Sequence, residues 1–250
     1  VQTCALPICV DDFAHFSGYD AAQVRRDEEQ LCRRADLVVT TSTALQDAKA
    51  AWNPNTILVP HGVDYAHFAR AVAEDLPEPS DLAGIPRPRL GFFGLLRDWV
   101  DLNLLAEVVR RRPDWHIVLI GDADSNVDLA ACRAASNVHC LGRRPYADLP
   151  AYCRHWDVGL IPFKINELTR AVNPIKLREY LAAGLPVVST PLPEVRLYEY
   201  LIHLAEGADD FERACEDALA DAIPAARRAR SQAMQTETWP AKLTRIAERL

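Results

Sequence analysis

Asn173, Lys176 and Glu179 are polar residues spaced three apart in a segment whose apolar pattern is helical. Residues three or four apart share one face of an α-helix, so these side chains are expected to lie together. Lys176 would stand in the first turn, where free N–H groups and the helix dipole favour an anion. Glu179, one turn later, is an acceptor-only carboxylate that can bind both hydroxyls of a ribose. The three could bind a nucleotide. The alternative is an ordinary exposed Lys and Glu pair, which occurs at this spacing on many helices.

The segment before this helix is expected to bring it to a ligand. An apolar strand at residues 158–161 leads into a polar loop at residues 166–170, and Pro174 suits a first helical turn. In an open parallel sheet, ligands bind outside the carboxyl ends of the strands, which is where this loop must lie. We therefore add Thr169 and Arg170 from the loop, and Leu177 from the helix, to the predicted binding residues.

Short apolar runs alternate with longer amphipathic stretches along the chain, which is typical of βαβ units around a parallel sheet. The sequence therefore predicts an α/β fold. Strands are expected at residues 37–40, 56–59, 89–93, 116–120, 138–141, 158–161, 187–189 and 200–204, and helices at residues 21–34, 43–51, 102–112, 127–135, 149–155, 175–183 and 209–222.

Residues 173–190 read NPIKLREYLAAGLPVVST. This run resembles the donor-site signature of bacterial family 4 glycosyltransferases of the GT-B fold. Other stretches resemble the same family in the same order, and the resemblance covers about residues 10–250. These stretches are LVPHGVD at residues 58–64, LGFFG at 90–94, LGRRPY at 141–146 and LPAY at 149–152.

The resemblance implies a Rossmann-like C-terminal domain with a parallel sheet, plus the remnant of an N-terminal Rossmann-like domain. Residues 10–62 would be the end of the N-terminal acceptor domain, and residues 63–235 the nucleotide-sugar donor domain. Residues 236–250, opening at Trp239, would form a helix that crosses back. Residues 1–9 lack the features of a signal peptide, and we interpret them as an artefact joined to the reading frame. Too few strands precede residue 62 for a complete sheet, so most of the acceptor domain is expected to be missing.

The chain departs from the family pattern at two places. Many members carry two glutamates separated by seven residues, but Ala171 stands where the first would precede Glu179. Glu167 is four residues out of place and is not assigned that role. After the strand that ends at Gly94, the usual Gly-Arg followed by Lys is replaced by Gly-Leu-Leu-Arg, so Arg97 is the basic substitute. By this resemblance Gly94 contacts the donor, and Arg97, Arg170 and Lys176 neutralise its diphosphate.

Asp11 and Asp12 would follow a strand near the interdomain cleft, although such residues more often form turns. We retain Asp12 as the cleft candidate. The seven histidines lack a spacing such as HExxH, so no metal is implied, and the resemblance suggests metal-independent transfer. No cofactor is expected beyond the donor itself, a UDP- or GDP-sugar.

The net charge of −7 argues against a nucleic-acid partner, because phosphate neutralisation needs a concentrated basic face. The richest basic cluster, Arg227, Arg228 and Arg230, is interpreted as a solvated helix face, which leaves room for a weak contact with anionic lipid. No apolar run approaches the ~18 residues of a membrane-spanning helix. The seven cysteines contain no CxxC pair and read as reduced thiols. We expect a cytoplasmic protein that contacts the inner face of the plasma membrane peripherally at most.

The predicted function is therefore transfer of a sugar from a nucleoside diphosphate sugar to a saccharide or lipid-linked acceptor of the bacterial envelope. Retention of anomeric configuration is implied by the resemblance only, no catalytic residue is assigned, and the fragment alone is expected to be inactive. Two alternatives stay open. One is a nucleotide-sugar 2-epimerase of the same fold, and the other is a non-catalytic fragment that only binds nucleotide.

Overall fold

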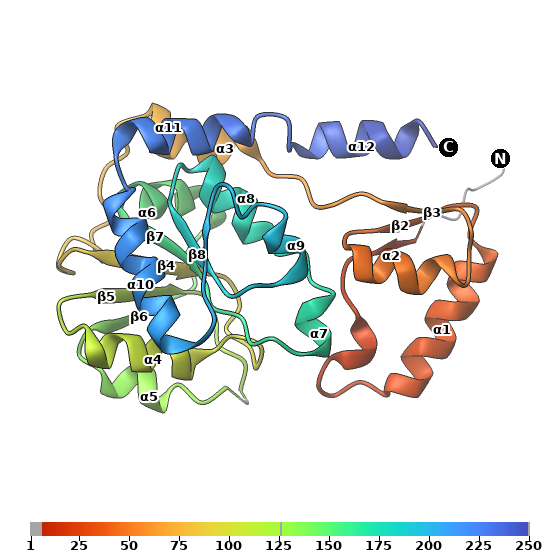
Figure 1. The fold of residues 1–250 in the computed structure, drawn as a ribbon, viewed down its shortest axis with the longest axis horizontal. Helices are drawn as coiled ribbons and strands as arrows, with labels where there is room; N and C mark the ends of the chain where they lie inside the picture. The colour runs from red at the N-terminus through yellow and green to blue at the C-terminus, as the bar shows by residue number, and fades with distance from the viewer. Residues whose placement is uncertain (1–6, 126, 250) are drawn as a thin grey trace.

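Two parallel sheets form two bodies that lie side by side in the computed structural model, which describes residues 7–125 and 127–249 (Figure 1). The smaller sheet has the order β1-β2-β3, with strands Ile8–Cys9, Val38–Thr40 and Thr56–Leu58. The larger sheet has six strands in the order β6-β5-β4-β7-β8-β9. The predicted α/β class with parallel sheets is thus confirmed. The strands of the larger sheet are β4 (Arg89–Phe93), β5 (His116–Ile120), β6 (Val138–Gly142), β7 (Val158–Ile161), β8 (Val187–Ser189) and β9 (His203–Leu204).

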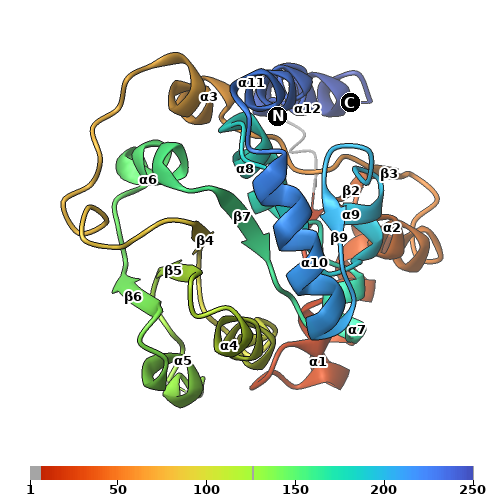
Figure 2. The ribbon, with the colours of Figure 1, turned by 60° about the vertical axis from the view of Figure 1, so that its left-hand side comes forward.

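Helices cover both faces of the larger sheet (Figure 2). The central strands β4 and β7 are fully buried, as continuous apolar runs between two helical layers should be. One layer consists of α4 (Leu102–Arg111), α5 (Ala130–Ala134) and α10 (Gly207–Ala220), and the other of α3 (Tyr65–Ala73), α6 (Leu149–His155), α8 (Ile175–Ala182) and α11 (Pro224–Ala233). Each of these helices is too short and too polar to cross a bilayer, and the same holds for every other helix among the described residues.

The smaller body carries α1 (Ala21–Arg34) and α2 (Thr43–Ala50), together with the short 3₁₀ helix η1 (Phe13–His15). Ile8 and Cys9 pair in parallel with Val39 and Thr40, so the end of the segment interpreted as an artefact forms a strand of this sheet. Residues 1–6 of that segment lie outside the described residues. Whether residues 7–9 belong to the natural reading frame stays untested.

Two segments of the chain connect the two bodies, one around Val63 and the other around Thr238, and they pair with each other. The Val63 N–H donates to the Glu237 carbonyl at 2.8 Å, and Val63 forms a β-bridge with Thr238. A side chain on Gly62 would come 2.5 Å from the Trp239 backbone nitrogen, so only glycine fits there. After this crossing, α12 (Trp239–Ala247) returns to the smaller body, where Ile246 packs with Leu37, Val39 and Val59.

Some element bounds differ from the predicted ones. α3 was not predicted, but its Phe68 and Ala71 are buried against the larger sheet, so tertiary packing stabilises it. The strand predicted at residues 200–204 shortens to β9, because successive turns occupy the preceding residues. The expected helix at residues 127–135 shortens to α5, which Asp128 precedes and stabilises by accepting from the Ala130 N–H.

Glu194 connects the two bodies through a buried polar contact. It lies on the short helix α9 (Pro193–Arg196), and 3% of it is exposed. One carboxylate oxygen accepts from the Thr43 N–H at the start of α2, at 2.7 Å. The other accepts from the Asn173 side-chain amide at 3.0 Å, just before α8. Glu194 therefore fixes the smaller body relative to the helix that carries the predicted site.

Exchange of Glu194 for Gln is expected to lower the free energy of unfolding by about 1 to 3 kcal/mol, because the new amide would face the Asn173 amide and leave buried donors unpaired. Urea denaturation followed by far-UV circular dichroism measures the change. Glu199→Gln, an exposed change of the same chemistry on the same segment, should alter stability by less than about 0.5 kcal/mol. Equal midpoints for the two variants would contradict the role of Glu194.

Candidate functional site

Lys176 lies at the carboxyl edge of the larger sheet, where β4 ends at Gly94 and α8 begins. Its ammonium nitrogen is 5.4 Å from the centre of the Phe92 ring and 5.9 Å from that of Phe163, within reach of a cation–π interaction. Gly94 has φ of +130°, and a side chain there would come 2.6 Å from the Lys176 nitrogen. Gly94 therefore leaves the space through which Lys176 passes. Gly94 and Lys176, both predicted to bind the donor, therefore lie next to each other in the structure.

The N-terminus of α8 is open to an anion. Among the described residues, no side chain caps this helix end, in contrast to α7 (Glu167–Arg170), which Asn166 caps. The first-turn N–H groups of Ile175 and Lys176 are of the kind that lack a partner within a helix. Combined with the Lys176 ammonium, they make a positively polarised position at the mouth of the cleft.

Glu179 is one helical turn from Lys176 and is almost fully buried, with 7% exposed. Burial raises the pKa of Glu179 to about 7, and the charge of Lys176 opposes that rise. Burial also lowers the pKa of Lys176, which Glu179 and Asp11 counteract. Lys176 is the charged group that favours the ionised form of the buried Glu179.

Asp11, rather than the predicted Asp12, faces Lys176 from the smaller body. Burial raises the pKa of Asp11 to about 6, and Lys176 lowers it. Asp12 forms an ion pair with His15 at 2.9 Å, at the start of η1. The Thr41 hydroxyl donates to the carbonyl of Val10, at 2.9 Å, and so fixes the backbone just before Asp11. Asp12 as the cleft residue stays a prediction, and the interaction of Asp11 with Lys176 adds Asp11 to it.

A cavity of about 380 Å³ opens at the carboxyl ends of β4, β5 and β6, and of the predicted site residues Gly94 lines it. Gly94, Gly121, Arg143 and Tyr146 contribute to its wall. Gly121 has φ of +142°, and a side chain on it would collide with the Gly94 carbonyl, so two glycines hold these strand ends together. The Tyr146 ring stacks on His67 at 4.5 Å, and Glu179 is close enough to contribute to the raised pKa of Tyr146, about 12, whose main cause is burial.

The sequence analysis did not select the residues of this cavity other than Gly94. One usable signal was present, because Gly121 follows a buried strand just as Gly94 does. Tyr146 lies in the stretch at residues 141–146 that resembles the family, but its contact with His67 from α3 depends on tertiary packing.

Of the other predicted residues, three are buried in structural contacts and one is exposed. The Thr169 hydroxyl is fully buried and donates to the Lys164 carbonyl at 2.5 Å. The Asn173 side chain is occupied by Glu194 and by Arg178, which donates to its oxygen at 2.7 Å. Leu177 is a core residue, and Arg170 is exposed at the end of α7. Direct contact of these four with a donor stays a prediction.

Arg97 follows Gly94 by one short turn, in the β4–α4 connection. Its Nε is 3.1 Å from a carboxylate oxygen of Asp124, and its guanidinium lies over the Trp99 ring at 5.4 Å. Its side chain is 32% exposed. Within residues 7–125 and 127–249 there is no cluster of His, Cys, Asp and Glu of the size that could hold a metal ion. Metal-independent chemistry stays a prediction.

Comparison with known proteins agrees with this arrangement. The family model described as "Glycosyl transferases group 1" matches residues 87–224. The Bacillus subtilis (strain 168) protein named "Putative teichuronic acid biosynthesis glycosyltransferase TuaH" is 31% identical, over 78% of this chain and 51% of that protein. The chain thus spans about half the length of this curated relative.

Two solved structures share the fold. The Anabaena protein Alr3699/HepE, in complex with UDP and glucose, has a TM-score of 0.71 at 18% identity, covering 97% of this chain and 70% of its own. A mutant of S. aureus TarM, in complex with fondaparinux, alpha-GlcNAc-glycerol and UDP, has a TM-score of 0.71 at 11% identity, covering 98% and 50%. The fold, the match to more than half of the chain and the identity to a glycosyltransferase lead to one conclusion: this chain belongs to the group 1 family of glycosyl transferases.

Proposed function

We propose that this chain supplies the donor-binding part of an enzyme that transfers a sugar from a nucleoside diphosphate sugar, a UDP- or GDP-sugar, to a saccharide or lipid-linked acceptor of the bacterial envelope. The observation that carries the proposal is the buried Glu179 carboxylate beside Lys176, at the open N-terminus of α8. The name of the Bacillus relative supports an envelope polysaccharide as the product.

The nucleoside would occupy the cavity at the ends of β4 to β6, with its base near Tyr146 and its ribose hydroxyls donating to Glu179. The diphosphate would then lie over Gly94, where Lys176 and the first turn of α8 meet it. Glycine at this position allows the close approach of a phosphate as well as of the lysine side chain. Arg97 and Arg170 would add charge from the cleft margin.

Transfer would proceed with retention. The bond between the anomeric carbon and the diphosphate breaks, and the leaving charge is stabilised by Lys176, Arg97 and the helix N-terminus. The acceptor oxygen forms the new bond on the same face, and its proton passes to the departing phosphate oxygen. The acceptor would enter from the side of the smaller body, where Asp11 faces Lys176.

The test is incubation of the chain, and of the longer protein from the same gene where one exists, with UDP- and GDP-sugar panels. Free nucleoside diphosphate and any epimer are followed with and without saccharide acceptors. Acceptor-dependent release of nucleoside diphosphate by either protein supports the proposal. An epimer formed without an acceptor favours the epimerase instead, and binding without turnover favours a non-catalytic role.

Exchange of Arg97 for Ala is expected to weaken nucleoside diphosphate binding about 3- to 10-fold, because a half-exposed cation already paired with Asp124 contributes only about 1 kcal/mol. Isothermal titration calorimetry at low salt measures the effect. Arg133→Ala, on α5 and away from the cleft, serves as the charge-matched control. An unchanged affinity in R97A would remove Arg97 from the diphosphate site.

A further inference from the structure

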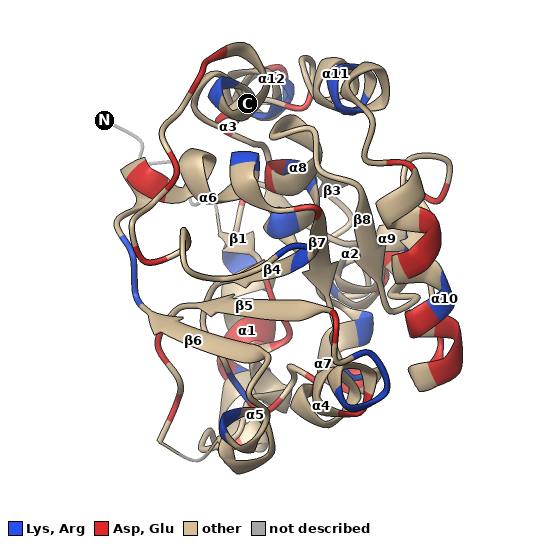
Figure 3. Ribbon diagram, turned by 90° about the vertical axis from the view of Figure 1, so that its left-hand side faces the viewer, with Lys and Arg blue, Asp and Glu red and all other residues tan. Residues whose placement is uncertain are grey.

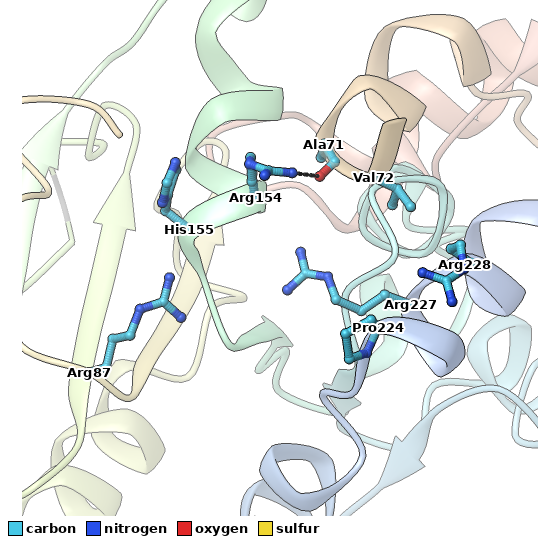
Figure 4. A pocket seen from close by; sticks show the side chains of 8 residues that line it. All are labelled: Ala71, Val72, Arg87, Arg154, His155, Pro224, Arg227 and Arg228. Carbon is cyan, nitrogen blue, oxygen red and sulfur yellow. Dashed lines mark hydrogen bonds between the residues drawn. The ribbon is translucent and has the colours of Figure 1, made fainter. Parts of the chain in front are cut away.

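A second cavity, of about 440 Å³, is lined by five basic residues: Arg87, Arg154, His155, Arg227 and Arg228. Figure 4 shows the guanidinium groups of Arg87 and Arg227 pointing toward each other from opposite walls. None of the residues that line it is acidic, within the part of the chain that the structure describes. The chain as a whole has a net charge of −7, and acidic residues are frequent along α10 (Figure 3).

This cavity lies at the amino ends of the strands, whereas the donor site lies at their carboxyl ends. Arg87 stands two residues before β4, and His155 stands three residues before β7, so both mark the amino ends of these strands. Gly94 and Lys176 lie at the carboxyl ends of the same strands. A ligand in this cavity would therefore be separate from the sugar donor.

The carboxylates around the cavity neutralise only part of its charge. Arg87 pairs with Asp157, and Arg154 pairs at 2.7 Å with Asp75, whose side chain is 98% exposed and so is screened by water. Glu78 is held by Arg89 and comes no closer than 4.0 Å to His155. Glu78 therefore interacts mainly with Arg89, which does not line the cavity.

Arg227 and Arg228 carry the uncompensated charge. Arg227 donates to the carbonyls of Cys153 and Trp156, at 3.2 and 3.3 Å, and has no carboxylate partner among the described residues. Burial lowers the pKa of Arg227; the nearby Asp157 opposes this, and the charges of Arg87 and Arg154 add to it. Arg228 is exposed and forms no ion pair within residues 7–125 and 127–249.

The interpretation of Arg227, Arg228 and Arg230 as one solvated helix face is wrong. Arg230 is buried and pairs with Asp221, away from the cavity. The Arg227 side chain contacts the end of α6, where it donates to the Cys153 carbonyl. Arg228 points elsewhere, because adjacent positions of a helix point in different directions. The cavity also includes Pro224, in the first turn of α11, where the helix dipole adds positive potential.

We propose that this cavity binds a phosphate-bearing ligand distinct from the sugar donor. Converging guanidinium groups match the oxygens of a phosphate bidentately, and the volume falls within the roughly 300–1,000 Å³ of small-molecule sites. The phosphate can belong to a soluble molecule or to the headgroup of an anionic lipid. The inference is independent of the proposed transfer reaction.

The experiment measures pyrophosphate binding by isothermal titration calorimetry in a Lys176→Met background, so that the donor cleft contributes little. Flotation with phosphatidylglycerol vesicles, compared with phosphatidylcholine vesicles, forms the second arm. The Arg154→Gln/Arg228→Gln variant is compared with Arg110→Gln/Arg213→Gln, which removes the same charge from exposed positions on α4 and α10. Arg228→Gln alone changes only an exposed side chain and guards against misfolding of the double variant.

The cavity variant is expected to lose at least about 10-fold in affinity for pyrophosphate or for the anionic vesicles, while the control double variant keeps its affinity. Loss with pyrophosphate identifies a soluble ligand, and loss with vesicles alone identifies a lipid headgroup. The inference is overturned if neither probe binds, or if both double variants weaken binding equally. Nucleotide affinity is not used in either arm, so the outcome is separate from that of the proposed function.

Discussion

Exchange of Glu179 for Gln is expected to weaken nucleoside diphosphate binding about 10- to 100-fold, because two ribose hydroxyls would lose a charged acceptor, and hydrogen bonds to charged groups contribute about 1.5–3 kcal/mol each. The amide is nearly isosteric with the carboxyl group, so the cavity keeps its shape. Isothermal titration calorimetry with UDP and GDP measures the change. Glu167→Gln, an exposed change at the start of α7, is the matched control.

Glu179→Gln should be at least as stable as the parent at pH 7, because the pKa of Glu179 is raised in the folded protein. Burial raises the pKa of Glu179 to about 7 from an ordinary value of 4.5. Between these values the folded protein binds more protons than the unfolded chain, so the contribution of Glu179 to the free energy of unfolding falls as the pH rises. Gln does not titrate and lacks this loss.

The stability of Glu179→Gln relative to the parent should therefore increase from pH 4.5 to pH 7.5, by roughly 1 to 3 kcal/mol. Urea denaturation at several pH values measures the difference, and subtraction of the two proteins cancels the titration of groups that the exchange leaves unchanged. A difference in stability that stays constant across this window would mean that folding does not raise the pKa of Glu179. Nucleoside diphosphate binding by the parent should tighten as the pH rises through 7, because the carboxylate is the form that accepts two hydroxyls.

Exchange of Lys176 for Met is expected to weaken nucleoside diphosphate binding about 100-fold, which corresponds to about 2.7 kcal/mol for the loss of a partly buried charge pair with phosphate. Met keeps the length and apolar stem of the side chain, so its packing over Gly94 is preserved. Binding of the free nucleoside, which has no phosphate, should change by less than about 2-fold when it is measured at a pH well above the pKa of Glu179, where the carboxylate is ionised in both proteins. This difference separates loss of the charge from damage to the cavity.

Lys164→Met provides the control for Lys176, because Lys164 is exposed and its ammonium donates to the Asp98 carbonyl at 2.7 Å. Its affinity for nucleoside diphosphate should stay within about 2-fold of the parent. Removal of Lys176 should also raise the pKa of Glu179 further, since Lys176 is the charge that lowers it. Equal loss of nucleoside and nucleoside diphosphate in K176M would assign Lys176 a structural role.

The elements that carry the site were predictable because their signals are local. The helix expected at residues 175–183 is present as α8, and Gly184 has φ of +76°, as a helix-ending glycine should. α3 was missed because its pattern follows a turn-rich segment and its stability comes from burial of Phe68. A strand just before Asp11 was expected from the family resemblance only, and β1 lies there; its own two residues carry no periodicity, and pairing with β2 makes them a strand.

Local sequence patterns predicted most of the strands and helices, the glycine that follows β4, and the placement of Lys176 and Glu179 one turn apart after a buried strand. These features depend on periodicity and on caps, which act over a few residues. Tertiary structure alone decided that Asp11 and not Asp12 faces Lys176, and that the Asn173 amide is held by Glu194 and Arg178. It alone gathered Arg87, Arg154 and Arg227 around one cavity. Such contacts join residues that are far apart in the chain, so the direction of each side chain depends on packing that no local pattern specifies.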